Sequence, residues 1–308
     1  MARVLLIANP AASGFTGGLH RDVVRILREA HDVDAVWPTS PGQVEELTDD
    51  AADAAFDMVV AFGGDGIAHH VACRLRNTAI PMGIVPAGTT NVLARILGVP
   101  SKAKAAARYL AAHMDTHVVS TARLEGRGKG IELDTCATFA AGLGWDADVV
   151  AIAEQEPYRK YRFGAMHYAR TAGAVLLKDY RGRPAMLRVS AGSRVSFGVT
   201  VLVQVHRPYT FFGRVPLALD GTQSEGLSIL VIEDLALLRV PRILTKAVRG
   251  SDLGRIKGLT VWTDLESVTI EAEPAVSLQA DGELIGLMSE LTLTHEPGVL
   301  TVAAPGRE

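Results

Sequence analysis

Short apolar segments alternate with helical segments over about the first 115 residues of the chain. Residues 3–8 (RVLLIA) form a continuous apolar run of strand length, and residues 19–30 carry apolar side chains at helical spacing. Further strands are expected at 33–37, 57–62 and 81–86. Continuous apolar strands alternating with helices are typical of a mostly parallel sheet covered on both faces. The sequence therefore predicts a three-layer α/β N-terminal domain, residues 1–117.

The pattern changes after about residue 117, where short β-rich segments are separated by Gly, Asp and Pro. Two helical stretches, around 146–179 and 235–249, interrupt these segments. This pattern predicts a mainly antiparallel β-sandwich as a second domain, residues 118–300. Residues 301–308 are expected to form a C-terminal tail, and its return to the first domain is left open. The cleft between two domains is the usual place for a site.

Composition excludes several classes of function. The net charge of −3 argues against a nucleic-acid partner, because no basic excess is available for phosphates. The N-terminus lacks the pattern of a signal peptide, and no apolar run reaches the ~20 residues needed to span a bilayer. The two cysteines, Cys73 and Cys136, lie far apart without metal-ligand spacing, which favours reduced thiols over a disulfide framework. A cytoplasmic location is expected, with any membrane contact peripheral.

Four glycine-containing loops follow apolar strands in the first half, at residues 8–14, 37–42, 62–66 and 85–91. Loops after parallel strands lie at one edge of the sheet, where ligands bind. Glycine lets backbone N–H groups point into a concavity that holds phosphate oxygens. For the first two loops, a plain βα turn with a helix cap is an equally good interpretation. The candidate nucleotide-binding residues are Asn9, Ser13, Thr39, Gly63, Gly64, Asp65, Gly66, Gly88, Thr89 and Asn91.

Asp65 lies within the glycines of the third loop, FGGDG. A carboxylate beside bound phosphates is repelled unless a cation intervenes, so Asp65 predicts Mg²⁺, held directly or through water. The chain contains no G-x-x-x-x-G-K-[ST] phosphate loop, and no G-x-G-x-x-G fingerprint follows the first strand.

The segments NPAASG, TSPGQ, GGDG and PAGTTNVLAR, in this order and spacing, resemble the catalytic domain of the diacylglycerol kinase family, which includes bacterial lipid kinases and sphingosine kinases. AAGLGWDADV (140–149), SEGLSILVI and LQADGELI (278–285) extend the resemblance over nearly the whole chain. It implies ATP-dependent phosphoryl transfer to a lipid hydroxyl. By matching position, Asp281 would be the general base with Glu283 beside it, Asp65 would belong to the nucleotide–Mg²⁺ network, and Asp146 would lie close by.

An aspartate can perform this chemistry although its reference pKa is low. The transition state of phosphoryl transfer is loose and the proton leaves late, so a carboxylate need only orient the hydroxyl and accept that proton. The alternative interpretation of ADGEL around Asp281 is a hairpin turn with Asp-Gly at its corner.

The chain departs from the family pattern at several positions. After GGDG, Ile67 and His70 stand where the family usually has Thr and Glu. Val92 stands where many diacylglycerol kinases have Asp. Glu225 replaces an Asp at the position of a structural Mg²⁺ site in the family. These differences leave a diacylglycerol acceptor and a second metal open. A basic, aromatic stretch, Tyr158–Phe163, could touch anionic lipid headgroups.

Two alternatives to a lipid kinase stay open. An NAD kinase shares GGDG and the two-domain plan, but the Asn-Glu pair expected for the nicotinamide ribose is not found. The other is a catalytically weak nucleotide- or lipid-binding regulator, which the retention of Asp65, Asp281 and Glu283 argues against. The expected partner is a membrane-derived diacylglycerol-like or sphingoid-like lipid, met in transient contact with the inner face of the membrane. A homodimer is left open.

Overall fold

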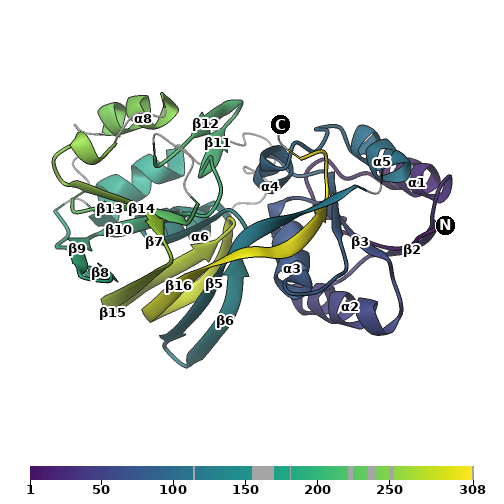
Figure 1. Cartoon of the computed structure of the whole chain (residues 1–308). Helices are drawn as coiled ribbons and strands as arrows, with labels where there is room; N and C mark the ends of the chain where they lie inside the picture. The colour runs from purple at the N-terminus through teal and green to yellow at the C-terminus, as the bar shows by residue number, and fades with distance from the viewer. Residues whose placement is uncertain are drawn as a thin grey trace. The chain divides into compact units, whose positions relative to one another are not determined.

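The computed structural model describes residues 1–113, 115–154, 170–180, 182–220, 225–234, 240–249 and 253–306. The chain forms two compact units (Figure 1). Unit 1 comprises Met1–Thr121 and Pro297–Glu308, and unit 2 comprises Ala122–Glu296. These bounds differ by a few residues from the sequence-based division.

Unit 1 is built on a parallel sheet. Its strands are β1 (Arg3–Ala8), β2 (Asp32–Val36), β3 (Met58–Gly63) and β4 (Met82–Pro86), and they lie in the order β2-β1-β3-β4. All residues of β3 and β4 are buried, which explains their unbroken apolar sequences. The predicted α/β domain with a mostly parallel sheet is confirmed.

Helices cover both faces of this sheet (Figure 1). One face carries α1 (Gly17–Arg28) and α5 (Ala103–Ala112), and the other carries α2 (Pro41–Asp53) and α3 (Asp65–Leu75). A short helix, α4 (Val92–Ile96), follows the loop after β4. Side-chain caps begin α1 and α2: Thr16 Oγ1 accepts from Leu19 N–H at 3.1 Å, and Ser40 Oγ accepts from Gln43 N–H at 3.2 Å.

Unit 1 also contains the last part of β16 (Glu283–Ala303), which begins in unit 2. Val302 and Ala303 pair in parallel with Met82 and Gly83 of β4. The carbonyl of Val299 accepts a hydrogen bond from the backbone of Asn77 at 2.7 Å. The C-terminal segment is therefore an integral part of the first sheet.

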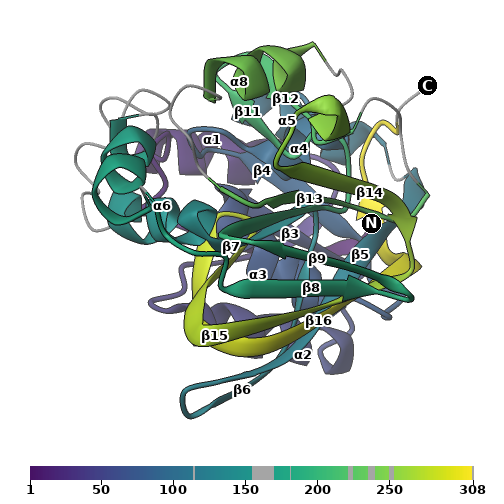
Figure 2. The same cartoon turned by 90° about the vertical axis from the view of Figure 1, so that its left-hand side faces the viewer.

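Unit 2 is rich in antiparallel strands, as predicted (Figure 2). The main path has the order β14-β13-β10-β7-β15-β16; β8 pairs with β15 and β9, and β5 pairs with β6. Their bounds are β5 (Thr116–Gly128), β6 (Ile131–Ala137), β7 (Ala140–Gly144), β8 (Leu187–Ala191), β9 (Arg194–Gly198), β10 (Thr200–Gln204), β13 (Leu227–Ile232), β14 (Leu259–Leu265) and β15 (Ser267–Ala280). A separate two-stranded ribbon consists of β11 (Thr210–Phe212) and β12 (Val215–Leu217).

Both helical stretches predicted for unit 2 include described helical residues. Described helical segments are α6 (Trp145–Glu154), residues 170–175 followed by a π-helical turn at Leu176–Tyr180, and α8 (Val240–Val248). No helix in the described ranges is long and apolar enough to cross a membrane. Neither Cys73 nor Cys136 is a free thiol, so the expectation of reduced cysteines is wrong.

Candidate functional site

The loops after β3 and β4 meet through their glycines. The carbonyl of Gly63, at the end of β3, accepts backbone hydrogen bonds from Ala87 at 2.7 Å and Gly88 at 3.1 Å. A Cβ atom on Gly88 would lie 2.5 Å from Gly64 Cα, a distance that real Cβ atoms essentially never show. The two backbones approach each other so closely that only glycine fits at position 88.

Asn91 holds the second of these loops in place. Its Oδ1 accepts from Gly88 N–H at 2.9 Å and its Nδ2 donates to the Gly88 carbonyl at 2.8 Å. Asn91 has φ +50°, a left-handed conformation that asparagine tolerates better than most residues. The Asn of PAGTTN therefore shapes the loop, and its side chain does not cap the following helix.

Helix α3 begins directly in the glycine loop, with Gly64 as its N-cap and no side-chain cap. This start contrasts with the capped starts of α1 and α2. The first N–H groups of a helix lack intrahelical acceptors and carry partial positive charge, so an uncapped N-terminus suits a phosphate oxygen. Asp65 is the first helical residue, and its Oδ1 accepts from Leu93 N–H at 3.2 Å, joining α3 to α4.

Asn9 and Ser13 bring the loop after β1 to the same place. The backbone N–H of Asn9 donates to the Phe62 carbonyl at 2.9 Å, and its Oδ1 accepts from Ala11 N–H at 2.9 Å. The hydroxyls of Ser13 and Thr89 lie 3.1 Å apart. Three of the four predicted loops are thus joined by hydrogen bonds at the carboxyl edge of the sheet, and we call this group the glycine-loop cradle.

Thr39 belongs to a different local structure. Its N–H and its hydroxyl both donate to Gln43 Oε1, at 2.7 and 3.0 Å. Gln43 also donates its backbone N–H to Ser40, so the loop after β2 forms a reciprocal cap for α2. A nucleotide-binding role for Thr39 stays a prediction.

His70 contacts helix α2. Its Nδ1 lies 3.0 Å from Glu45 Oε1, and the neighbouring His69 is buried. Within the described ranges, no group of three or more His, Cys, Asp or Glu side chains is arranged to hold a metal ion. The replacement of the family Glu by His70 therefore contributes a contact between two helices.

Asp281, in unit 2, is 1% exposed and sits at the turn between β15 and β16 with φ +54°. Its Oδ2 accepts from the N–H and hydroxyl of Thr138 at 2.7 and 2.9 Å. Its Oδ1 accepts from the N–H groups of Phe139 and Ala140 at 2.9 and 3.1 Å. A carboxylate offers about four acceptor positions. These four donors tie the turn to residues 138–140, and the role of Asp281 as general base stays a prediction.

Asp146, in the first turn of α6, lies in a network with Tyr209 and Gln279. Its Oδ2 accepts from Tyr209 Oη at 2.7 Å and from Gln279 Nε2 at 2.8 Å, and Gln279 Nε2 also lies 3.0 Å from Tyr209 Oη. Burial raises the pKa of Asp146 above its ordinary value, while the two hydrogen bonds oppose the rise. Burial and the negative charges of Asp146 and Asp281 raise the pKa of Tyr209 well above its ordinary value, so this hydroxyl stays protonated as a donor.

The same network connects to Asp281 through the backbone. Gln279 Oε1 accepts from Gly282 N–H at 2.8 Å, directly after Asp281. Glu283, half-buried, begins β16 opposite Ala280. Asp146, Asp281 and Glu283 thus belong to one region of unit 2, which we call the carboxylate network.

Sequence reasoning missed Tyr209, Gln279 and Thr138. Gln279 carried a usable signal, because it precedes Asp281 by two residues and strand side chains two apart share a face. No local pattern marks Tyr209 or Thr138. The basic and aromatic stretch Tyr158–Phe163 lies outside the described residues. Glu225 is exposed, and its backbone N–H donates to Asp264 Oδ1 at 3.1 Å.

Comparisons with known proteins agree on one family. Residues 3–123 match the diacylglycerol kinase catalytic domain. The chain is 23% identical over 295 residues to a diacylglycerol kinase of Bacillus subtilis, covering 94% of this chain and 92% of that protein. It is 24% identical over 310 residues to a diacylglycerol kinase of Mycobacterium tuberculosis, covering 99% and 96%. An uncharacterized protein of Synechocystis is 26% identical over 277 residues, and the match spans 85% of this chain but only 58% of that protein.

Solved structures share the fold of the chain. A diacylglycerol kinase structure from Bacillus anthracis superimposes with a TM-score of 0.69 at 18% identity, covering 98% of this chain and 97% of that one. An NAD kinase from Archaeoglobus fulgidus, solved in complex with ATP, superimposes with a TM-score of 0.53 at 12% identity, covering 97% and 92%. The glycine-loop cradle lies inside residues 3–123, the part of the chain that matches the diacylglycerol kinase catalytic domain. This domain match, together with relatives named diacylglycerol kinase, supports a lipid kinase.

Proposed function

We propose that the protein transfers the γ-phosphate of Mg-ATP to a hydroxyl of a diacylglycerol-like or sphingoid-like lipid. The observation that carries this proposal is the glycine-loop cradle, where Gly64 and Gly88 approach too closely for a Cβ and α3 starts without a cap. Such a concavity of backbone groups fits phosphate oxygens. The related structure with bound ATP adds support for ATP as phosphoryl donor.

The residues of the cradle fit Mg-ATP in charge as well as in shape. Backbone N–H groups at the start of α3, with the hydroxyls of Ser13 and Thr89, would hold phosphate oxygens. Asp65 would bind Mg²⁺, a hard cation that prefers carboxylate oxygens. Bound Mg-ATP would supply the phosphoryl group and neutralise developing charge.

The carboxylate network would receive the proton of the acceptor hydroxyl. We assign this role to Asp281, with Glu283 as its neighbour. Because four donors already engage Asp281, acceptance of a proton requires one of these hydrogen bonds to give way. Tyr209 and Gln279 keep Asp146 in place beside this region.

A radiolabelled-ATP screen tests the proposal. Purified protein with Mg²⁺ is offered diacylglycerol, sphingosine, ceramide, monoacylglycerol and NAD, the lipids in mixed micelles. Label in a lipid product supports the proposal and identifies the acceptor class. Label in NAD alone would replace it with the NAD kinase alternative. ATP binding without label in any acceptor would favour a nucleotide-binding regulator.

A further inference from the structure

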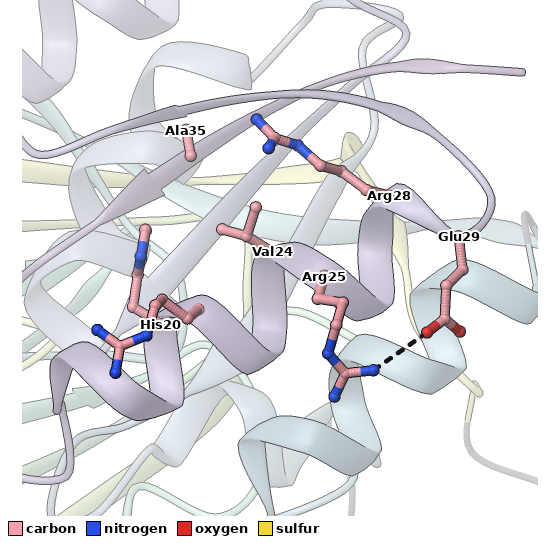
Figure 3. Close-up of a pocket in the computed structure, with 7 residues that line it drawn as sticks. His20, Val24, Arg25, Arg28, Glu29 and Ala35 are labelled. Carbon is pink, nitrogen blue, oxygen red and sulfur yellow. Dashed lines mark hydrogen bonds and ion pairs between the residues drawn. The ribbon is translucent and has the colours of Figure 1, made fainter.

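One face of α1 carries three exposed arginines in a row. Arg21, Arg25 and Arg28 are spaced four and three residues apart, so they share a side of the helix, while Val23, Ile26 and Leu27 are buried against the sheet. A groove of about 520 Å³ runs along this face, bounded by the three arginines with His20, Glu29 and Ala35 of β2 (Figure 3). The face is open and lies on unit 1 alone.

The charge of this face is positive although the chain carries a net charge of −3. Asp22 is paired with Lys104 of α5 at 2.5 Å and lies 3.6 Å from Arg25, and Glu29 lies 3.4 Å from Arg25. The three arginines and Lys104 thus carry four positive charges, against two negative charges on Asp22 and Glu29. In the described part of the chain, Arg21 and Arg28 form no ion pair.

The acidic side chains of β2 lie on the other side of the sheet. Residues alternate between the faces of a strand, so Asp32 and Asp34 point away from Ala35, and Asp34 pairs with Arg3 at 3.0 Å. Arg28 Nη2 donates to the Val33 carbonyl at 3.1 Å and fixes that end of the arginine row against the outermost strand of the sheet.

An exposed indole adjoins the arginine row. Trp37 is 53% exposed, its Nε1 donates to His20 Nε2 at 3.0 Å, and the two rings meet edge to face. Burial and the charge of Arg21 lower the pKa of His20, so the arginines supply the charge of this face at neutral pH. Tryptophan is enriched at membrane–water interfaces, where its ring sits among headgroups.

We propose that Trp37 and the α1 face with Arg21, Arg25 and Arg28 form the surface through which the protein contacts an anionic lipid bilayer. The row from Arg21 to Arg28 extends about 10 Å along the helix, which suits several neighbouring headgroups rather than one phosphate held by converging donors. The choice of a bilayer as partner rests on the lipid-kinase function proposed above. The surface shares no residue with the cradle, although the ring of Phe15 contacts both Trp37 and Phe62 of β3.

Vesicle co-sedimentation without nucleotide tests this surface. Full-length protein is mixed with phosphatidylcholine vesicles, with and without phosphatidylglycerol. The variant Arg21→Gln/Arg25→Gln should bind the anionic vesicles about 20-fold more weakly than the original protein, because each basic side chain contributes to attraction near a charged membrane. Adding Trp37→Ala to this variant should weaken its binding to the anionic vesicles further. The control Arg74→Gln/Arg123→Gln removes the same charge from arginines that pair with Asp49 and Asp134, and should bind normally.

The outcomes separate the proposal from its rivals. Equal loss in the control pair, or no loss in the α1 pair, overturns it. Inorganic phosphate that abolishes vesicle binding at constant ionic strength would show a single-anion site instead. A change of sedimentation coefficient in the α1 variant would show an interface between two copies of the chain. Turnover of a detergent-dispersed acceptor should stay unchanged in the α1 variant, so a failure of the kinase proposal would be seen separately.

Discussion

At the scale of single residues, Asp281 and Asp146 are both hydrogen-bonded aspartates, yet the same substitution should destabilise the protein far more at position 281 than at position 146. Donors reach both oxygens of Asp281, two on each, whereas both donors of Asp146 reach Oδ2. An asparagine has one acceptor oxygen and one NH₂ group. It can therefore replace Asp146 without losing a donor, but at position 281 its NH₂ must face backbone N–H groups.

We expect Asp281→Asn to lower the free energy of unfolding by on the order of 3 kcal/mol, because buried donors lose their acceptor. Asp146→Asn should change it by less than about 1 kcal/mol at weakly acidic pH. Urea denaturation followed by circular dichroism measures both. Equal effects of the two substitutions would contradict the network. If Asp281→Asn stays folded and binds ATP but does not turn over, the assignment as general base gains direct support.

The raised pKa of Asp146 makes a second residue-scale prediction. A carboxyl whose folded pKa lies above its ordinary value of 3.8 binds its proton more tightly in the folded state. The contribution of the Asp146 carboxyl to the free energy of unfolding is therefore complete below pH 3.8 and is lost as pH rises through the folded pKa. Asp146→Asn removes this dependence. Denaturation between about pH 4 and pH 7 should show the variant gaining stability relative to the original protein as pH rises. A constant difference across that range would contradict the shift.

At the scale of elements, the close approach of the loops after β3 and β4 predicts that adding one methyl group, in Gly88→Ala, destabilises the protein. In Gly88→Ala the new Cβ would lie 2.5 Å from Gly64 Cα and 2.8 Å from Asn91 Oδ1, and backbone atoms cannot give way as a flexible side chain does. We expect a loss of about 1–3 kcal/mol in stability and weaker binding of Mg-ATP by calorimetry. Gly173→Ala is the matched control, since nothing lies within 4 Å of its added Cβ. Unchanged ATP affinity in Gly88→Ala would show that the loop containing Gly88 does not contribute to ATP binding.

The elements of unit 1 were more predictable than those of unit 2, for a physical reason. Strands expected at 57–62 and 81–86 are observed at Met58–Gly63 and Met82–Pro86, because strands buried on both faces must be apolar throughout. In unit 2 the register of β15 on β7, with Leu278 opposite Leu143, brings Asp281 to residues 138–140. Pairing between segments more than 130 residues apart leaves no local periodicity, so the carboxylate network could not be assembled from sequence.

At the scale of the whole molecule, the chain leaves unit 1 through β5 and returns to it through β16. Every glycine-loop motif lies in the first hundred residues, yet the sheet that positions those loops is completed by residues near the C-terminus. Leu300 and Val302 are fully buried, and Val302 pairs with Met82 of β4. The strand before the PAGTTN loop therefore depends on a segment more than 200 residues away.

Deleting residues 297–308 should consequently abolish Mg-ATP binding although it removes no motif residue. Burial of Leu300 and Val302 contributes about 4 kcal/mol together, which is a large share of the 5–15 kcal/mol that stabilises a typical domain. Deleting only residues 305–308 leaves the paired strand intact and serves as the control. Thermal unfolding with and without Mg-ATP distinguishes the two truncations, since a ligand raises the unfolding temperature only of a protein that folds its site. If Mg-ATP raised the unfolding temperature of both truncated proteins by the same amount, the cradle would form without the C-terminal strand. Strand β4 would then need no pairing with β16 to hold the loop that follows it.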